Sequence, residues 1–261
     1  MELRSIKSEV HMKQLANKIA VVTGGNNGIG LAVARLYASE GAKVVITGRN
    51  PVSIRSAVAL IGHGAGGLVS DASNIGCLTQ TFEDITTKFA GKIDILVVNA
   101  GVYIPAPFAQ YTEEMFDETS DINFKGAFFT VQFALPFLNN GASIILTGAT
   151  VAETATINGA AFAASKAALR SLARSFSAEL LSRDIRVNVI SPGPTDTAMF
   201  ERSMHRVVQA GGTKKHWLTR SPLKRLASTE EVAKAYLYLA SDASRYMLGA
   251  EIVIDGGDRT I

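Results

Sequence analysis

The sequence predicts one α/β domain in which helices cover both faces of a doubly wound parallel sheet. Short runs rich in Val and Ile alternate with longer segments of helical periodicity almost to the end of the chain, which is typical of repeated βαβ units. The short runs are apolar on both faces, as the strands of a buried parallel sheet are. The 261 residues contain no linker or internal repeat, and this length suits a single large domain.

Seven runs are expected to form strands, and six segments between them are expected to form helices. In chain order, the expected strands are 18–23, 43–47, 68–70, 93–99, 143–146, 186–190 and 252–254. The expected helices are 28–39, 52–61, 75–89, 113–138, 159–182 and 230–239. Because crossovers between parallel strands are right-handed, these elements predict a single sheet with helices on each side.

The composition of the chain narrows the classes of function that it can have. Hydrophobic residues make up 47% of the chain and charged residues 19%, so a sizeable core is expected and disorder is not. No apolar stretch approaches the roughly 20 residues of a membrane span. The net charge of +3 comes without a tract of interleaved basic and aromatic residues, so nucleic-acid binding is not expected. The four histidines lack metal-ligand spacing, so no metal site is expected either.

The N-terminal residues and the single cysteine bear on where the protein works. Residues 1–17 mix charged and apolar side chains and lack the apolar core of a secretory signal, so we expect an N-terminal extension before a domain that spans 18–261. Translation can start at Met1 or at Met12. Cys77 is the only cysteine, which excludes an internal disulfide and suits the reducing cytoplasm.

A glycine-rich turn follows the first expected strand. The segment from Gly24 to Gly30 reads Gly-Gly-Asn-Asn-Gly-Ile-Gly and leads into the first expected helix. Glycine is needed where φ is positive or where a Cβ would collide with a ligand. The amides at the start of the helix then face an anion such as a pyrophosphate. A tight strand-to-helix turn alone can explain an isolated glycine cluster, but this one opens the first βαβ unit, as a Rossmann-type dinucleotide site requires.

The spacing Thr-Gly-x-x-x-Gly-Ile-Gly from Thr23 to Gly30 resembles the short-chain dehydrogenase/reductase (SDR) family, and further segments agree in the family's order. They are Asp71-Ala-Ser, Asn99-Ala-Gly101, Asn123 within Asp-Ile-Asn-Phe-Lys-Gly, Ala164-Ser-Lys-Ala-Ala168, Arg186-Val-Asn188, Ser191-Pro-Gly-Pro-Thr-Asp-Thr197 and Asp255-Gly-Gly257. The resemblance covers the chain from about Lys18 to its C-terminus.

This resemblance implies a seven-stranded parallel sheet with a nicotinamide dinucleotide across its C-terminal edge. It places Asp71 near the adenine, Asn99 beside a ribose, Lys166 on the nicotinamide ribose, and Thr195 and Thr197 at the nicotinamide end. The full set of expected cofactor-binding residues is Thr23, Gly24, Asn27, Gly28, Ile29, Gly30, Arg49, Asp71, Ala72, Asn99, Ala100, Gly101, Lys166, Pro192, Gly193, Thr195 and Thr197. The resemblance also implies a substrate lid at about 196–225 and a homotetramer formed through the helices at 113–138 and 159–182.

The end of the second expected strand indicates which dinucleotide is preferred. An acidic residue there accepts hydrogen bonds from a ribose 2′-hydroxyl and repels a 2′-phosphate. This chain instead reads Val-Val-Ile-Thr-Gly-Arg-Asn from Val44 to Asn50. Arg49 offers a bidentate guanidinium to a phosphate, so we predict NADP(H) over NAD(H). A solvated loop arginine is the alternative explanation.

The catalytic residues are where the sequence departs from the family. Reduction of a carbonyl by hydride leaves an alkoxide, so the site must donate a proton and stabilise negative charge. The family uses Tyr-x-x-x-Lys on one helix, a Ser ahead of it and an Asn on a neighbouring helix. Asn123 and Lys166 match this pattern, but Phe162 stands at the Tyr position and Ala149 at the Ser position. Loss of a general acid costs about 10²–10⁴ in rate, so ordinary turnover is expected to be weak or absent.

Four nearby side chains are candidate substitutes for the missing hydroxyls: Thr150, Thr147, Glu153 and Tyr103. For each of them a non-catalytic explanation is favoured, namely threonines at a strand end, a solvated glutamate and a half-buried tyrosine.

The lid is basic, with Arg202, Arg206, Lys214, Lys215, Arg220, Lys224 and Arg225, and with His205 and His216, against Glu201 alone. Such a lid attracts an anionic ligand by electrostatic steering, although a solvated helical face explains it too.

Four interpretations of the function stay open. The first is an NADP-dependent oxidoreductase of the SDR type with a rearranged site, and the second is a non-catalytic dinucleotide-binding sensor or partner subunit. The third is a non-redox enzyme that uses the same pocket, with Glu153 as its acid or base. The fourth is an engineered, inactive variant of a working reductase, since Ser→Ala and Tyr→Phe are the changes that inactivation would introduce. The small-molecule substrate is not readable from the sequence.

Overall fold

A computed structural model of the chain describes residues 13–89, 91–209 and 221–261. It contains one sheet of seven strands, all paired in parallel, in the order β3-β2-β1-β4-β5-β6-β7. The strands are β1 (Ile19–Thr23), β2 (Lys43–Gly48), β3 (Gly66–Val69), β4 (Ile93–Val98), β5 (Leu138–Thr147), β6 (Arg186–Pro192) and β7 (Glu251–Ile254). The predicted doubly wound, seven-stranded α/β fold is therefore confirmed.

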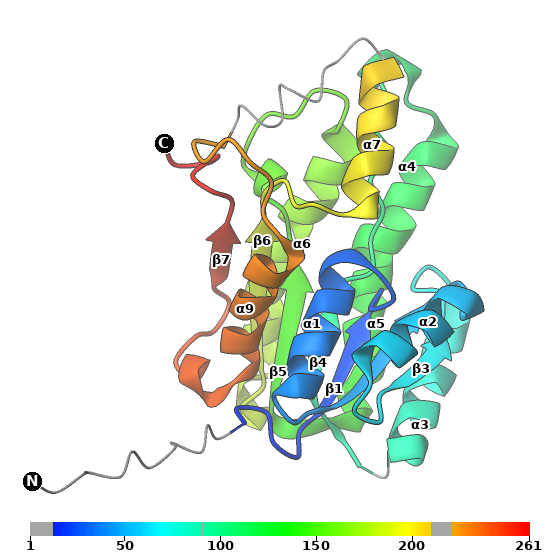
Figure 1. The fold of residues 1–261 in the computed structure, drawn as a ribbon, viewed down its shortest axis with the longest axis vertical. Coiled ribbons are helices and arrows are strands. Elements are labelled where there is room, and N and C mark those ends of the chain that lie inside the picture. Colours follow the sequence, from blue (N-terminus) through cyan, green and yellow to red (C-terminus); the bar gives the residue numbers. More distant parts are fainter. Residues whose placement is uncertain (1–12, 90, 210–220) are drawn as a thin grey trace, which may run out of the picture.

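Helices cover both faces of this sheet (Figure 1). They are α1 (Gly28–Ser39), α2 (Pro51–Ile61), α3 (Leu78–Phe89), α4 (Glu113–Ser120), α5 (Gly126–Ala134), α6 (Ala160–Glu179), α7 (Ala198–Gln209) and α9 (Thr229–Ala240). One apolar core joins the sheet to α1, α2 and α9, and a second joins its other face to α3, α5 and α6. In the first core, the buried hydroxyl of Tyr37 donates to the Tyr236 carbonyl over 2.9 Å, which fastens α1 to α9.

The strand order changes direction between β1 and β4, because β1 is followed outward by β2 on one side and by β4 on the other. Loops that leave neighbouring strands on opposite faces of a sheet part at such a point, and they open a crevice beyond the carboxyl ends of the strands. Figure 1 shows α4 and α7 beyond this edge of the sheet. The fold therefore places the glycine-rich turn after β1 and the loops after β4 and β5 around a common opening.

Several predicted elements differ from the structure; the fifth strand, for instance, begins at Leu138 rather than at residue 143. The expected helix 113–138 is broken into α4, a π-helical turn at Asp121–Lys125 and α5, and its last residue already belongs to β5. A close backbone approach marks the break, because a Cβ on Gly126 would lie 2.5 Å from the Ala72 carbonyl oxygen. The third strand begins at Gly66 rather than at residue 68. Two glycines in its first half weaken the β pattern, since glycine is depleted in strands.

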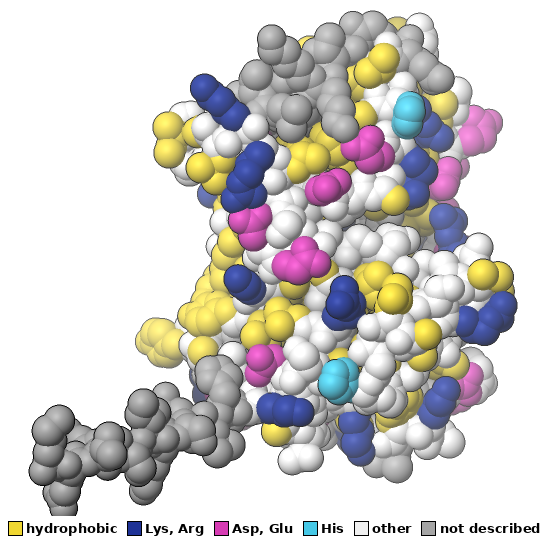
Figure 2. Space-filling model, in the orientation of Figure 1, with side chains coloured by type: hydrophobic (Ala, Val, Ile, Leu, Met, Phe, Trp, Pro, Cys, Tyr) yellow, Lys and Arg dark blue, Asp and Glu magenta, His cyan; other side chains and the backbone are white. Residues whose placement is uncertain are grey.

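The described part of the predicted N-terminal extension packs against the domain. Leu15 is completely buried, and its amide donates to the Glu40 carbonyl over 3.0 Å. Packing thus begins three residues before Lys18, whereas residues 1–12, including Met12, lie outside the described residues. None of the described helices is both long enough and apolar enough to cross a membrane. Figure 2 shows acidic and basic side chains interspersed over one face of the molecule.

Candidate functional site

A cleft with a volume of about 1680 Å³ opens at the carboxyl edge of the sheet. The expected site residues that line it are Gly24, Asn27, Gly28, Ile29, Arg49, Asp71, Ala72, Asn99, Ala100, Gly101, Ala149, Phe162, Lys166, Pro192, Gly193, Thr195 and Thr197. Thr23, Gly30 and Asn123 lie behind this lining. The structure thus brings together, around one opening, residues that the sequence scatters from the first strand to the loop after the sixth.

Backbone geometry shapes the wall formed by the glycine-rich turn. Gly24 and Gly28 have φ values of +63° and +51°, which side chains other than glycine rarely adopt. A Cβ on Gly30 would lie 2.5 Å from the Gly24 carbonyl oxygen. Asn27, the N-cap of α1, makes no side-chain hydrogen bond to the helix amides. The first amides of α1 therefore stay available to an anion in the cleft, where the helix dipole favours negative charge.

Thr23 and Asn99 tie this turn to the end of β4 from behind. The hydroxyl of Thr23 accepts from the amides of Asn99 and Ala100 over 3.0 and 3.1 Å. The Asn99 side chain donates to the carbonyls of Thr23 and Gly24 over 3.0 and 3.2 Å. These bonds hold the loop after β4 against the glycine-rich turn, so the two walls keep a fixed spacing.

Arg49 and Asp71 stand on the rim formed by the second and third strands. Arg49 directly follows β2, is exposed and lines the cleft. The next residue, Asn50, caps α2 by accepting from the amides of Val52 and Ser53 over 2.8 and 3.1 Å, which fixes the turn that carries Arg49. The Asp71 carboxylate accepts from the Ser73 amide over 3.0 Å, so it is held at the surface of the cleft.

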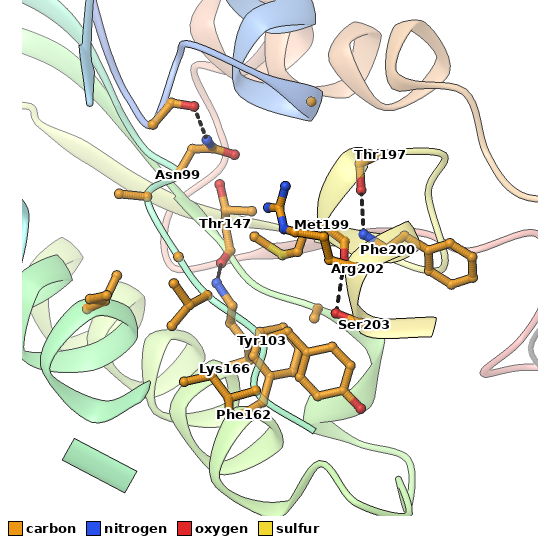
Figure 3. A pocket seen from close by; sticks show the side chains of 18 of the residues that line it. Asn99, Tyr103, Thr147, Phe162, Lys166, Thr197, Met199, Phe200, Arg202 and Ser203 are labelled. Atoms are coloured by element: carbon orange, nitrogen blue, oxygen red, sulfur yellow. Dashed lines mark hydrogen bonds between the residues drawn. The ribbon is translucent and has the colours of Figure 1, made fainter. Parts of the chain in front are cut away.

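Lys166 and Phe162 form the floor near the end of β5 (Figure 3). They lie one turn apart on α6, and the Lys166 Nζ is 5.6 Å from the centre of the Phe162 ring. The Lys166 ammonium donates to the Thr147 carbonyl over 2.7 Å. Burial lowers the pKa of Lys166 from 10.5 to about 8. The Lys166 ammonium therefore lies beside an aromatic ring that cannot donate a proton, because Phe carries no hydroxyl.

Asn123 lies outside the lining of the cleft, and its side chain forms hydrogen bonds within the protein. Its side-chain oxygen accepts from the Val102 amide over 2.8 Å, and its nitrogen donates to the Val102 carbonyl over 2.9 Å. The same nitrogen lies 3.2 Å from the Ser165 hydroxyl on α6. The π-helical turn that carries Asn123 is common at functional positions. Here it lets one amide clamp the loop after β4 to the helix that bears Lys166.

Three of the four candidate substitutes for the missing hydroxyls are occupied or turned away. The Thr147 hydroxyl lies 2.8 Å from that of Tyr236 in the core. The Tyr103 ring lies 4.7 Å from the Phe162 ring, but its hydroxyl is buried beside Gly159, whose Cβ would lie 3.2 Å from that oxygen.

Glu153 is the third of these side chains and lies outside the lining of the cleft. It is exposed, as expected of a solvated glutamate, and it also pairs with Arg170 and Arg259, which the sequence did not indicate. Those arginines also pair with Glu251 of β7, which makes a four-membered ionic cluster. Thr150 is the candidate that remains, because it is buried and lines the cleft directly after Ala149.

The structure describes the predicted lid at residues 196–209 and 221–225, and α7 in the first of these ranges lines the cleft with Met199, Phe200, Arg202, His205 and Arg206. Thr197 caps this helix, since its hydroxyl accepts from the Phe200 amide over 3.1 Å. Arg225 instead lies outside the lining of the cleft and pairs with Glu231 at a distance of 2.7 Å. Lys224 also lies outside the lining of the cleft. The remaining predicted lid cations, Lys214, Lys215, His216 and Arg220, lie outside the described residues.

The lining of the cleft also contains residues that were not predicted from the sequence. Glu114 and Glu118 of α4 line the cleft, as do Ile104 and Pro105 in the loop before it. Thr112 caps α4 by accepting from the Met115 amide over 3.3 Å. The spacing of the two glutamates, four residues apart on one helix face, was the available signal. Within the described ranges, no cluster of three or more His, Cys, Asp or Glu side chains is placed to hold a metal ion.

Known proteins resemble this chain over nearly its whole length. A family model described as enoyl-(acyl carrier protein) reductase matches residues 24–258. Oxidoreductase asL5 of Sarocladium schorii is 35% identical over 248 residues, covering 94% of this chain and 97% of its own. The 3-oxoacyl-(acyl-carrier-protein) reductase FabG of Thermotoga maritima is 33% identical over 250 residues, covering 94% and 98%.

Solved structures agree with these relatives. A chain described as a short chain dehydrogenase/reductase family protein is 36% identical, with a TM-score of 0.82 over 95% of this chain and 100% of its own. A short-chain dehydrogenase/reductase of Brucella melitensis, described as a glucose/ribitol dehydrogenase, is 31% identical, with a TM-score of 0.87 over 95% and 99%. The fold and the cleft are those of an oxidoreductase scaffold. The chain belongs to the short-chain dehydrogenase/reductase family.

Proposed function

We propose that this protein binds a nicotinamide dinucleotide, NADP(H) rather than NAD(H), and that its ordinary carbonyl reduction is weak or absent. One observation carries the second half of the proposal. At the floor of the cleft, Lys166 lies beside the ring of Phe162, and Ala149 lines the same floor. We assign Phe162 and Ala149 to the positions where SDR enzymes hold Tyr and Ser. Neither side chain can donate a proton or a hydrogen bond.

The cofactor half of the proposal rests on the shape of the wall after β1. Cβ atoms on Gly24 and Gly28 would lie 3.0 Å from Ala100 and 3.3 Å from Thr197, so glycine keeps this cradle open for a ligand. The free amides at the start of α1 suit a pyrophosphate, and the exposed Arg49 suits a 2′-phosphate. When bound, the nicotinamide would supply or accept a hydride.

The residues present can hold and orient such a cofactor but lack the Tyr and Ser that would complete the reaction. Lys166 would position a ribose hydroxyl with its ammonium, while Asp71 and Asn99 would fix the adenine and ribose ends. Asn123 keeps the loop after β4 in place for these contacts. If a carbonyl accepted a hydride here, the resulting alkoxide would face the ring of Phe162 and the methyl group of Ala149. The missing general acid accounts for about 10²–10⁴ in rate.

A second candidate function is that of a non-catalytic, dinucleotide-binding sensor or partner subunit. The packing of Tyr103 against Phe162 favours it, because the ring fills the floor where a phenol would act. A non-redox enzyme that uses Glu153 has less support, since this carboxylate is held by two arginines outside the cleft. We also propose a homotetramer, with α4, α5 and α6 at the contacts; light scattering that gives a monomer mass would overturn it.

Two measurements on one preparation test the proposal. Calorimetric titration with NADPH and NADH is expected to show binding of both, with NADPH about tenfold tighter; equal affinities would refute the NADP preference, and no binding would refute the cofactor site. NADPH oxidation over a panel of aldehydes and ketones is expected to be near background. The Ala149→Ser/Phe162→Tyr variant is the matched comparison, and turnover by the unmodified chain equal to that of the variant would show that another group supplies the proton.

A further inference from the structure

Arg202 is the charged side chain of α7 that Figure 3 shows reaching into the cleft, on the side of Thr147 and Asn99. It is exposed, and no acidic side chain within the described residues pairs with it. A bidentate guanidinium that faces a cleft without a partner is suited to a carboxylate or a phosphate. Its position is set by α7, whose first turn is capped by Thr197.

The surroundings of Arg202 are apolar on the side of the cleft floor. Met199 of the same helix lines the cleft, and the paired rings of Tyr103 and Phe162 face it from below. Lys166 is the other cation at the floor, but its ammonium is buried and bonded to the Thr147 carbonyl. A ligand therefore meets apolar surface at the floor and a basic α7 wall, from which Arg202 reaches into the cleft beside His205 and Arg206 of the same helix.

The part of the cleft lining that α4 supplies has the reverse charge. Glu114 and Glu118 of α4 are exposed and line the cleft there. An anionic group on a ligand is repelled by these carboxylates and attracted by Arg202, with His205 and Arg206 on the same helix. Attraction at one wall and repulsion at the other orient a charged ligand within the cleft.

We infer that the natural ligand of the cleft is a small molecule with an apolar body and one carboxylate, and that the carboxylate is bound by Arg202. This inference deepens the proposed function, because it places the ligand beside the cofactor in the same cleft. Without a Ser or Tyr hydroxyl at the floor, Arg202 supplies the polar anchor that a ligand needs in a mostly apolar pocket.

The test compares carboxylates with their primary amides on the NADPH-saturated protein. The probes are hexanoate, octanoate and 4-phenylbutanoate, each beside its amide, with affinities measured by saturation-transfer NMR and calorimetry. At least one carboxylate is expected to bind about tenfold more tightly than its amide, and the advantage is expected to shrink as salt is raised. The inference is overturned if every amide binds as well as its acid.

Two variants separate the role of Arg202 from general charge. Arg202→Gln is expected to remove the advantage of the carboxylates and leave the amides unchanged, whereas Arg35→Gln, an exposed position on α1 outside the cleft, is expected to keep it. If Arg202→Gln instead weakens NADPH itself and leaves carboxylates unaffected, Arg202 serves a cofactor phosphate and the inference is wrong. NADPH affinity of the unmodified chain is measured first, so that failure of the cofactor proposal is recognised separately.

Discussion

The wall of the cleft after β1 and the floor of the cleft are built by different means. The wall after β1 is shaped by backbone: Gly24 and Gly28 adopt positive φ, and Gly30 leaves no room for a Cβ. The floor at β5 and α6 depends on what its side chains carry, and Phe162 packs well against Tyr103 at 4.7 Å. A change at the first wall disturbs the fold, whereas a hydroxyl can be absent from the floor at no cost to packing. Binding and chemistry can therefore be separated in one cleft.

The largest effect is expected from returning a phenol to the floor. Phe162→Tyr is predicted to raise NADPH-dependent reduction over a carbonyl panel by about 10²–10⁴, because a general acid returns one helical turn from the Lys166 ammonium, which lowers a phenol pKa. Initial rates of NADPH oxidation give the measurement, and Phe162→Leu is the control that adds no proton donor. If both variants stay at background, side-chain loss at this position is not what limits the reaction.

The opposite experiment alters the backbone-shaped wall. Gly30→Val puts a Cβ within 2.5 Å of the Gly24 carbonyl oxygen and 2.6 Å of the Asn99 side chain, so the turn must shift. NADPH affinity is predicted to fall about 100-fold or more, with a lower thermal midpoint. Gly76→Ala is the matched control, since its Cβ meets only Asn74 at 3.5 Å. An unchanged dissociation constant for Gly30→Val, measured by calorimetry, would contradict a rigid wall.

Lys166 connects the floor to pH. Its pKa is lowered by burial to about 8 from 10.5, so between these values the unfolded chain binds a proton that the folded chain does not. The free energy of unfolding is therefore expected to increase by about 3 kcal/mol as the pH rises from about 8 to 10.5. This contribution is absent below pH 8. Urea unfolding at several pH values is expected to show this rise in the unmodified chain and not in Lys166→Met. Parallel pH profiles for the two proteins would place the titration elsewhere.

The smallest effect concerns the rim. Arg49→Ala is predicted to weaken NADPH about tenfold and leave NADH unchanged, because only the phosphorylated ribose gains a charge-assisted pair. Arg55→Ala, an exposed position on α2 outside the cleft, removes the same charge and should change neither affinity. Calorimetry with both dinucleotides distinguishes specific pairing from a general field, which would weaken NADPH equally in the two variants.

Much of the fold is predictable because its signals are local. Short apolar runs that alternate with segments of helical periodicity indicated the doubly wound sheet. The turn from Gly24 to Gly30 indicated the wall after β1. The break in the helix at Asp121–Lys125 was missed, because it is stabilised by contacts with Val102 and Ala72, which lie far off in the sequence. Such tertiary contacts override local propensity.

Side-chain partners in the site were less predictable for the same reason. Nothing near Glu153 in the sequence indicates that the fold brings two arginines to this exposed carboxylate. The α4 wall was also missed, since Glu114 and Glu118 look like the surface of any helix until the fold places them in the lining of the cleft. Residues whose role is set by backbone conformation were located from sequence, and residues whose role is set by a distant partner were not.

The ionic cluster around Glu153 gives the end of the chain an influence on the cleft. Arg259 reaches back from the C-terminal segment to Glu153 and Glu251, and Glu153 follows the turn of Ala149 that lines the cleft floor. Replacing Arg259 by a neutral residue would remove one of the two guanidinium groups that hold Glu153. A side chain far away in the sequence thus helps to fix a wall of the cleft whose lining it does not join.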